Sequence, residues 1–144
     1  MGARVQPLET DEVRSALMSR VRQRGTKPEL VVRALLTDLG VRYRLNTNTL
    51  PGSPDISNKR AKKAIYVHGC FWHRHAGCRR TTTPKRNRVF WLEKFKRNEQ
   101  RDAEKSAALV ALGFDLLVVW ECESERLPAL RARLDRFWHS ASNR

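Results

Sequence analysis

A short segment of the chain gathers residue types that bind metals and transfer protons. From His68 to Cys78 the sequence reads His-Gly-Cys-Phe-Trp-His-Arg-His-Ala-Gly-Cys, so three histidines and two cysteines fall within eleven residues. Thiolate and imidazole are the ligands that zinc prefers in proteins, and a neutral imidazole can accept a proton from water near neutral pH. The segment could therefore hold a metal, catalyse a proton transfer, or do both.

Four cysteine and histidine side chains form a candidate zinc site. Cys70, His75 and Cys78 lie within nine residues, and Cys122 follows an apolar segment that could form a strand beside the one ending at His68. Together they make a Cys3His set, and four protein ligands are typical of structural rather than catalytic zinc. The set uses every cysteine in the chain. The alternative is three buried thiols that bind no metal.

Asp55 and two histidines form a candidate catalytic centre. Asp55 follows two prolines and a glycine, and His68 ends a later apolar segment, so a hairpin would carry Asp55 on one arm and His68 on the other. A carboxylate there can hold a divalent cation against a phosphate, while His68 or His73 takes a proton from water. Taken alone, an aspartate after proline is more often a turn former, and for Glu29 a helix cap is favoured over catalysis.

The elements that must position these side chains alternate between helices and strands, as in an α/β domain. Thr26, Pro28 and Glu29 make a capping box for a helix that Gly40 ends. Residues 114–120 are a nearly continuous apolar run, which suits a strand covered on both faces of a sheet. The remaining patterns predict helices over residues 11–23, 86–112 and 125–138, and strands over 41–45, from Ile56, and over 64–68.

The chain is strongly basic. Its 144 residues include 29 lysines and arginines against 15 acidic residues, which gives a net charge of +14. This indicates a polyanion partner, of which nucleic acid is the commonest, and the alternative is a merely soluble basic surface. At this length we expect one domain over residues 11–144 after a flexible leader over residues 1–10. The expected phosphate contacts lie in the N-terminal helix and in the loop after the histidine-rich segment: Arg20, Arg22, Arg79, Arg80, Lys85 and Arg86.

Apolar side chains among these charges could contact the bases of a nucleic acid. Phe71 and Trp72 follow Cys70 directly, Trp91 follows the basic loop, and Met18 lies among the arginines of the predicted N-terminal helix. Exposed aromatic rings beside arginine can stack on bases or wedge between them. The alternative is that all of these side chains belong to the core.

The apolar runs of the chain are short. None is long enough for a transmembrane span, and the N-terminus has no apolar stretch of the kind that a secretory signal contains. The three cysteines are an odd number and do not suggest a disulfide framework. We therefore expect a cytoplasmic protein, associated with the nucleoid if its partner is DNA.

Several motifs, in order, resemble the very short patch repair (Vsr) DNA mismatch endonucleases. They lie at residues 50–55, 67–75, 90–94 and 118–122, and the match runs in the same order from about residue 14 to 123, including residues 14–18 and 26–29. Several motifs in the same order are more specific than any one of them. One departure is the spacing from His75 to Cys78, which is one residue longer than in the best-known member.

The resemblance implies a restriction-endonuclease-like fold of the PD-(D/E)XK type, with a mixed central β-sheet flanked by helices and a structural zinc site. It also implies that Asp55 binds magnesium together with the main-chain carbonyl of Val67. By the same resemblance, His68, His73 and Glu29 belong to the active site, and His73 is the general base.

The implied activity is the nicking of one DNA strand beside the T of a T·G mismatch. By the same resemblance, Phe71, Trp72 and Trp91 wedge into the duplex, and Met18 approaches from the opposite groove. The expected partner is double-stranded DNA that contains a mismatch, bound by a monomer. Two other functions stay open: a zinc-stabilised DNA-binding module without catalysis, and a restriction or homing endonuclease that cuts paired DNA.

Overall fold

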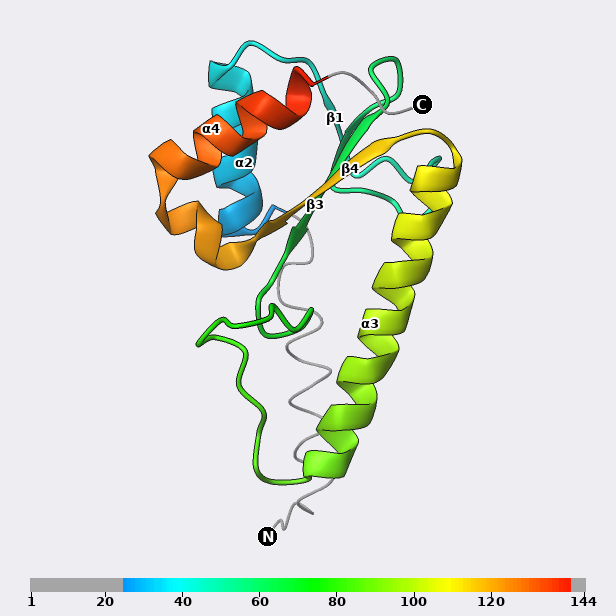
Figure 1. Ribbon diagram of the computed structural model, residues 1–144, viewed down its shortest axis with the longest axis vertical. Coiled ribbons are helices and arrows are strands. Elements are labelled where there is room, and N and C mark those ends of the chain that lie inside the picture. Colours follow the sequence, from blue (N-terminus) through cyan, green and yellow to red (C-terminus); the bar gives the residue numbers. More distant parts are fainter. Residues whose placement is uncertain (1–24, 141–144) are drawn as a thin grey trace, which may run out of the picture.

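The protein is a small α/β structure with helices on both sides of one sheet. The computed structural model describes residues 25–140. Figure 1 shows helices α2 (Lys27–Asp38) and α4 (Leu127–Trp138) on one side of the sheet and the long helix α3 (Arg88–Ala111) on the other. The N-terminal helix predicted over residues 11–23, with Met18, Arg20 and Arg22, and the leader over residues 1–10 lie outside the described residues.

The sheet has four strands and is mixed. Its strands are β1 (Arg44–Leu45), β2 (Ile56–Asn58), β3 (Lys63–His68) and β4 (Asp115–Trp120), and they lie in that order across the sheet. The first three strands pair antiparallel, and β3 and β4 pair parallel. Parallel strands end at the same edge of a sheet, so the segments that follow β3 and β4 leave the sheet side by side.

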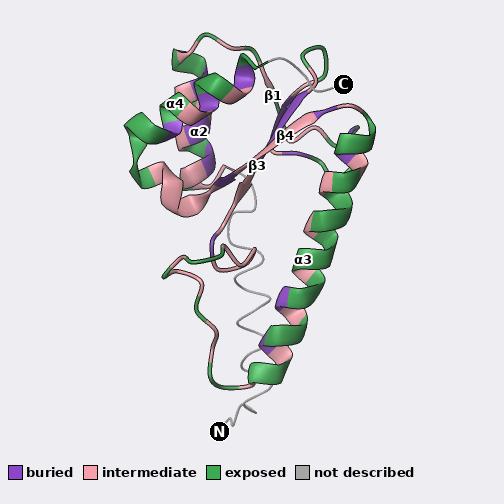
Figure 2. Cartoon of the chain, viewed as in Figure 1, coloured by how far each residue is buried: buried purple, intermediate pink, exposed green. Residues whose placement is uncertain are grey.

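Alternate side chains of the strands enter two separate cores. Ile65 packs with Ile56 and Val119 under α2 and α4, whereas Ala64 and Tyr66 pack toward α3 with Leu50, Leu109 and Phe114. Successive residues of a strand point to opposite faces, so a sheet with a core on each face needs apolar residues at consecutive positions. The apolar run at residues 114–120 follows this pattern, because Leu117 and Val119 belong to the first core and Leu116 and Val118 to the second, which confirms the prediction that it is covered on both faces. In Figure 2, β4 is coloured as buried or intermediate.

Most predicted elements are present close to their expected bounds. The capped helix, the long helix, the apolar strand and the last helix correspond to α2, α3, β4 and α4, and a short 3-10 helix, Glu121–Glu125, precedes α4. Thr26 caps α2 because its side-chain oxygen accepts the backbone N–H of Glu29 at 3.4 Å. The strand predicted over 41–45 is shorter than expected, because β1 is an edge strand that pairs only with Ile56 and Ser57.

Within residues 25–140, no helix is both long enough and apolar enough to cross a membrane.

Candidate active site and metal cluster

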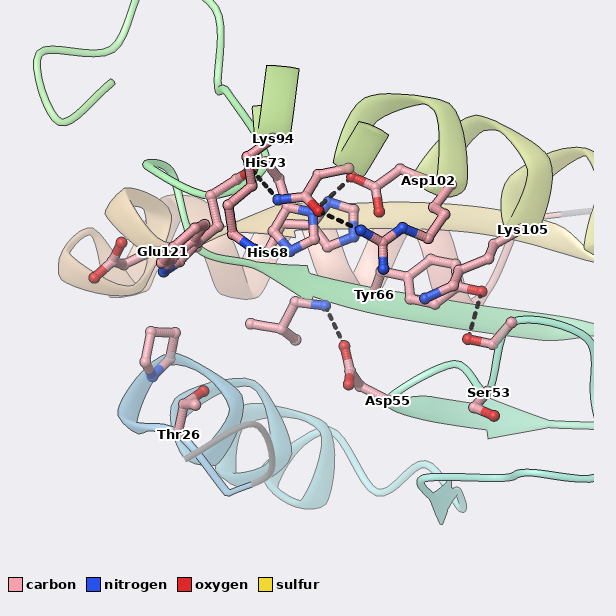
Figure 3. Close-up of a pocket in the computed structure, with 17 residues that line it drawn as sticks. Thr26, Ser53, Asp55, Tyr66, His68, His73, Lys94, Asp102, Lys105 and Glu121 are labelled. Carbon is pink, nitrogen blue, oxygen red and sulfur yellow. Dashed lines mark hydrogen bonds and ion pairs between the residues drawn. The ribbon is translucent and has the colours of Figure 1, made fainter. Parts of the chain in front are cut away.

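A cavity of about 550 Å³ lies between β3, the loop before β2, and α3. Asp55, Val67, His68, Trp72 and His73 all line it. Figure 3 shows Asp55 near the end of the β2–β3 hairpin and the two histidines above it, toward α3. The structure therefore brings three of the four proposed catalytic side chains, and the residue proposed to contribute a carbonyl, to one cavity.

Asp55 is held by the backbone of the neighbouring strand. Its Oδ2 accepts the N–H of Val67 at 2.7 Å, and among residues 25–140 its Oδ1 has no hydrogen bond. Burial raises the pKa of Asp55 to about 6; the Val67 N–H lowers this pKa, and the negative charge of Glu29 raises it further. A carboxylate oxygen without a protein donor fits a hard divalent cation, which prefers oxygen ligands.

Gly52 allows the loop before Asp55 to approach α3 closely. Its φ is +73°, and a Cβ there would overlap the Tyr66 hydroxyl and lie 2.7 Å from the Cβ of Lys105. Tyr66 in turn donates its hydroxyl hydrogen to the Gly52 carbonyl at 3.1 Å. Only glycine fits this position without strain, so the loop that carries Asp55 is clamped between β3 and α3.

The two histidines of the cavity are stacked, and one of them is hydrogen-bonded to a carboxylate. The rings of His68 and His73 lie 3.8 Å apart and nearly parallel, at 8°. His73 Nδ1 lies 2.6 Å from Oδ2 of Asp102 on α3. A carboxylate can only accept, so Nδ1 carries the proton and Nε2 of a neutral His73 is free to accept one.

The surroundings of His68 and Asp102 shift their pKa values and so fix their charges at pH 7. Burial and the neighbouring His73 lower the pKa of His68 to about 4, so His68 is neutral at pH 7. Burial raises the pKa of Asp102, but the hydrogen bond and charge of His73 outweigh burial and hold that pKa below its usual value. Asp102 therefore stays ionised and can stabilise a protonated His73.

Asp102 is a further residue of the cavity, which the sequence alone does not predict. It lies 29 residues after His73 on a helix dense in charge. The available signal was helical spacing, since Lys94, Asn98 and Asp102 follow one another at intervals of four and line the same cavity. That signal could not single out Asp102, because α3 also carries three glutamates: Glu93, Glu99 and Glu104.

Glu29 is a buried cap residue. Only 2 % of it is exposed, its carboxylate accepts the N–H of Gly25 at 3.2 Å, and Arg33 lies 3.9 Å away. The predicted capping box thus forms with Gly25 in place of the Thr26 backbone as the donor. Glu29 is not among the described residues that line the cavity, and its negative charge raises the pKa of Asp55.

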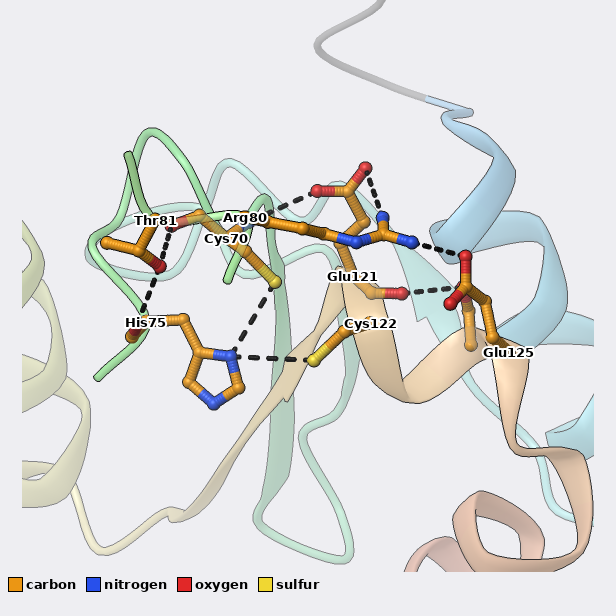
Figure 4. Close-up of polar contacts among 8 residues, drawn as sticks. Cys70, His75, Arg80, Thr81, Glu121, Cys122 and Glu125 are labelled. Atoms are coloured by element: carbon orange, nitrogen blue, oxygen red, sulfur yellow. Dashed lines mark hydrogen bonds and ion pairs between the residues drawn. The ribbon is translucent and has the colours of Figure 1, made fainter. Parts of the chain in front are cut away.

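A second cluster lies beside the cavity, where β3 and β4 end (Figure 4). The ligand atoms of Cys70, His75, Cys78 and Cys122 all lie within 4.8 Å of one another. Nδ1 of His75 is 3.6 Å from the sulfur of Cys70 and 3.5 Å from that of Cys122. Two ligands at tetrahedral zinc, with bonds of about 2.3 Å to sulfur and 2.0 Å to nitrogen, stand roughly 3.5 Å apart. The cluster could therefore bind a metal, and its donor set fits zinc.

Further contacts fix the backbone around the cluster. Thr81 donates to the carbonyl of His75 at 2.6 Å, and Glu121 accepts the N–H of Cys70 at 3.2 Å. Burial raises the pKa of the Cys70 thiol to about 12 when no cation is bound. A metal bound at the cluster would have to displace that proton, so its affinity would depend on pH.

The aromatic side chains differ in exposure. Phe71 and Trp72 are half-buried, and Lys94 lies 5.8 Å from the Trp72 ring. Trp91 is fully buried, 5.9 Å from the Trp72 ring, and its indole N–H has no hydrogen-bond partner in the described part of the chain. In this conformation Trp91 is a core residue that supports Trp72 and is not itself open to a duplex.

The basic residues proposed for phosphate contacts also differ. Arg79, Lys85 and Arg86 are exposed in the loop between the cluster and α3. Arg80 already pairs with two carboxylates, at 3.3 Å from Glu121 and close to Glu125. Arg80 therefore supports the cluster segment, and a phosphate would have to compete with these acids for it.

A carboxylate beside paired histidines, in a cavity with lysine and arginine side chains, is an arrangement that suits the hydrolysis of phosphodiesters. Comparison with known proteins specifies the class of protein. Residues 8–80 match the family described as DNA mismatch endonuclease Vsr. The chain belongs to this family and is a DNA endonuclease.

Three relatives each match most of the chain. The Type II nicking enzyme V.XorIIP of Xanthomonas oryzae pv. oryzae is 47% identical over 123 residues, 85% of this chain and 90% of the relative. The Type II nicking enzyme V.NmeAIP of Neisseria meningitidis is 41% identical over 127 residues, 88% of this chain and 90% of the relative. The DNA mismatch endonuclease Vsr of Escherichia coli is 38% identical over 120 residues, 83% of this chain and 72% of the relative.

Proposed function

We propose that the protein nicks one strand of double-stranded DNA beside the T of a T·G mismatch by magnesium-dependent hydrolysis. The main support for this proposal is that Asp55 and the stacked rings of His68 and His73 line the same cavity. Membership of the Vsr family supports DNA as the substrate. We also propose a PD-(D/E)XK-type fold, a single domain over residues 11–144, a monomer, and action on the nucleoid in the cytoplasm.

Asp55 and the main-chain carbonyl of Val67 are the groups that would hold magnesium. A magnesium ion there would stabilise the negative charge that develops on the phosphate. Asp55 suits this role because Val67 N–H fixes one of its oxygens and its other oxygen has no donor in residues 25–140. Glu29, behind Asp55, has an indirect part in the active site, through its charge.

His73 is the proposed general base. Its Nε2 accepts the proton of the attacking water, while Asp102 holds the ring and stabilises the imidazolium that results. His68 stacks on His73 and, being neutral at pH 7, does not repel the proton that His73 gains. A carboxylate, an oriented histidine and a neutral neighbour therefore divide the work of activating water.

The cluster of Cys70, His75, Cys78 and Cys122 is the proposed structural zinc site. His73 lies between two of these ligands in the chain, so a metal held by Cys70 and His75 restrains the backbone of the general base. The proposed zinc therefore acts on catalysis by positioning and takes no part in the reaction itself.

Phe71 and Trp72 are proposed to wedge into the duplex, with Trp91 packed behind them. Unstacking a base step costs a few kcal/mol and costs less at a mismatched pair, which gives a physical basis for selectivity. Arg79, Lys85 and Arg86 are exposed for phosphate contacts; Arg80, Met18, Arg20 and Arg22 complete the proposed DNA-contacting set.

A nicking assay tests the proposal. Matched duplexes that differ only in one T·G or T·A pair, in a panel of flanking sequences, are incubated with magnesium and with the wild type or Asp55→Ala. We expect nicking of the T-containing strand of the T·G duplex, lost in Asp55→Ala and kept in Asp38→Ala, which removes an exposed carboxylate of α2. Binding without nicking would indicate a DNA-binding module, and equal cutting of the T·A duplex would indicate a restriction-type nuclease.

A further inference from the structure

One face of α3 lines the cavity with polar side chains. Lys94, Asn98, Arg101 and Lys105 all contribute to the cavity wall. They follow one another at intervals of three or four residues, so they form a single stripe along the helix. This stripe faces the edge of the sheet where Asp55 and the histidines lie (Figure 3).

Three of these four side chains have partners inside the protein. Lys94 lies 5.8 Å from the centre of the Trp72 ring, and Asn98 donates to the Trp72 carbonyl at 3.5 Å. Arg101 donates to the side-chain oxygen of Asn98 at 2.9 Å. Lys105 has no hydrogen bond and no ion pair within residues 25–140. It is thus the member of the stripe whose charge is left for a ligand.

The stem of Lys105 is held at the Asp55 end of the cavity. A Cβ on Gly52 would lie 2.7 and 2.9 Å from the Cβ and Cγ of Lys105, so the stem packs against the loop that leads to Asp55. Figure 3 shows Lys105 reaching from α3 past Tyr66, on the side of Asp55 and Ser53. The positive charge of Lys105 lowers the pKa of Asp55, His68 and Asp102, so it acts on the ionisable groups around the proposed position of the phosphate.

We propose that Lys105 binds a non-bridging oxygen of the phosphate that is cleaved, and so is a further catalytic residue. Lysine is a compact cation that binds phosphate oxygens as a point charge. The cleaved phosphate must lie near both Asp55 and His73, and Lys105 is an uncommitted cation on that wall of the cavity. This inference rests on the proposed function, because it assumes that Asp55 and His73 lie at the cleaved phosphate.

The charge of Lys105 would favour both the binding of DNA and the reaction itself. In the ground state it attracts the DNA backbone, and in the transition state it meets the additional negative charge on the phosphate oxygens. Lys105→Met keeps the apolar stem against Gly52 and removes the charge. Lys105→Arg keeps the charge, and Lys96→Met is the matched control, since Lys96 is an exposed lysine of α3 that does not line the cavity.

Binding to neutralised DNA locates the contact. Affinity for a T·G duplex is measured in magnesium-free buffer, with the natural backbone or with one methylphosphonate at the cleaved or the adjacent phosphate. We expect Lys105→Met to weaken binding of the natural duplex by about tenfold, and this loss to vanish only when the cleaved phosphate is neutral. An equal loss on all three duplexes, or a loss that vanishes only at the adjacent phosphate, would overturn the proposal.

Turnover gives a second, independent readout. With magnesium and saturating T·G duplex, we expect Lys105→Met to lower kcat by roughly a hundredfold, Lys105→Arg to recover part of it, and Lys96→Met to stay within about twofold of wild type. Wild-type kcat in Lys105→Met refutes the role of Lys105. Absence of nicking by the wild type refutes the proposed function instead, and the affinity of Lys105→Met for the natural duplex then still shows whether Lys105 contacts DNA.

Discussion

The ionised carboxylate of Asp55 is expected to lower the free energy of unfolding, because it is buried. Its pKa is about 6 in the folded protein against an ordinary value of 3.8, and this difference corresponds to about 3 kcal/mol, since a tenfold change in acidity is about 1.4 kcal/mol. The folded state binds the proton more tightly than the unfolded chain between these two values. Stability therefore falls as pH rises from about 4 to 6, and the ionised, buried carboxylate carries the full cost at pH 8.

Asp55→Asn tests this reasoning. The amide oxygen of asparagine can still accept the N–H of Val67, and the charge is gone. Because Asp55 is partly exposed, we expect Asp55→Asn to exceed wild type in free energy of unfolding by about 2–3 kcal/mol at pH 8, and by less than about 1 kcal/mol at pH 4.

The assay is urea denaturation followed by tryptophan fluorescence, in magnesium-free buffer at both pH values. Other titrating groups are common to both proteins, so their contributions cancel in the difference. Asp38→Asn, at an exposed carboxylate of α2, is the control and should change stability by less than about 1 kcal/mol at either pH. The reasoning is refuted if Asp55→Asn is no more stable than wild type at pH 8, or if its advantage is the same at pH 4.

Three further predictions concern the parts around Asp55. Asp102→Asn should lower kcat for nicking by roughly 10²–10⁴-fold with little change in KM, because it removes the charge that stabilises protonated His73; an unchanged kcat would argue against that base. Cys122→Ser should lose bound zinc, measured by elemental analysis, and lower the Tm; a variant that keeps both would show that the cluster needs no fourth ligand. In thermal denaturation, Gly52→Ala should lower the free energy of unfolding by about 1–3 kcal/mol more than Gly40→Ala does. Both positions have positive φ, but of the two only Gly52 has other atoms within 4 Å of an added Cβ. Equal effects would contradict the close packing of Gly52 between β3 and α3.

Local signals in the sequence were enough to predict most of the fold. The Thr26 cap and the glycine at position 40 predict where α2 begins and ends, and the apolar run before Cys122 predicts β4. These signals come from residues that are close together in the chain, so tertiary packing does not change the elements that they predict. The length of β1 could not be predicted in this way, because it depends on how much of β2 is available to pair with it.

The candidate site was predictable only where chain neighbours carry it. Asp55 and His68 belong to one hairpin, and three of the cluster ligands lie in one short segment. Asp102 lies on α3, on the other side of the cavity, and only the tertiary fold brings it to His73. Trp91 illustrates the same limit, since an aromatic residue after a basic loop has the same sequence pattern whether it is exposed or, as here, fully buried.

The interleaving of His73 between Cys70 and His75 has a consequence for how such a chain can evolve. An inserted residue between Cys70 and His75 would shift His73 away from Asp102 and disturb the cluster at once, so this stretch cannot vary in length without loss of both. The stretch from His75 to Cys78 only closes the cluster, and its Ala76 and Gly77 are exposed, with open space around Gly77. We therefore expect differences in length among relatives to occur between His75 and Cys78.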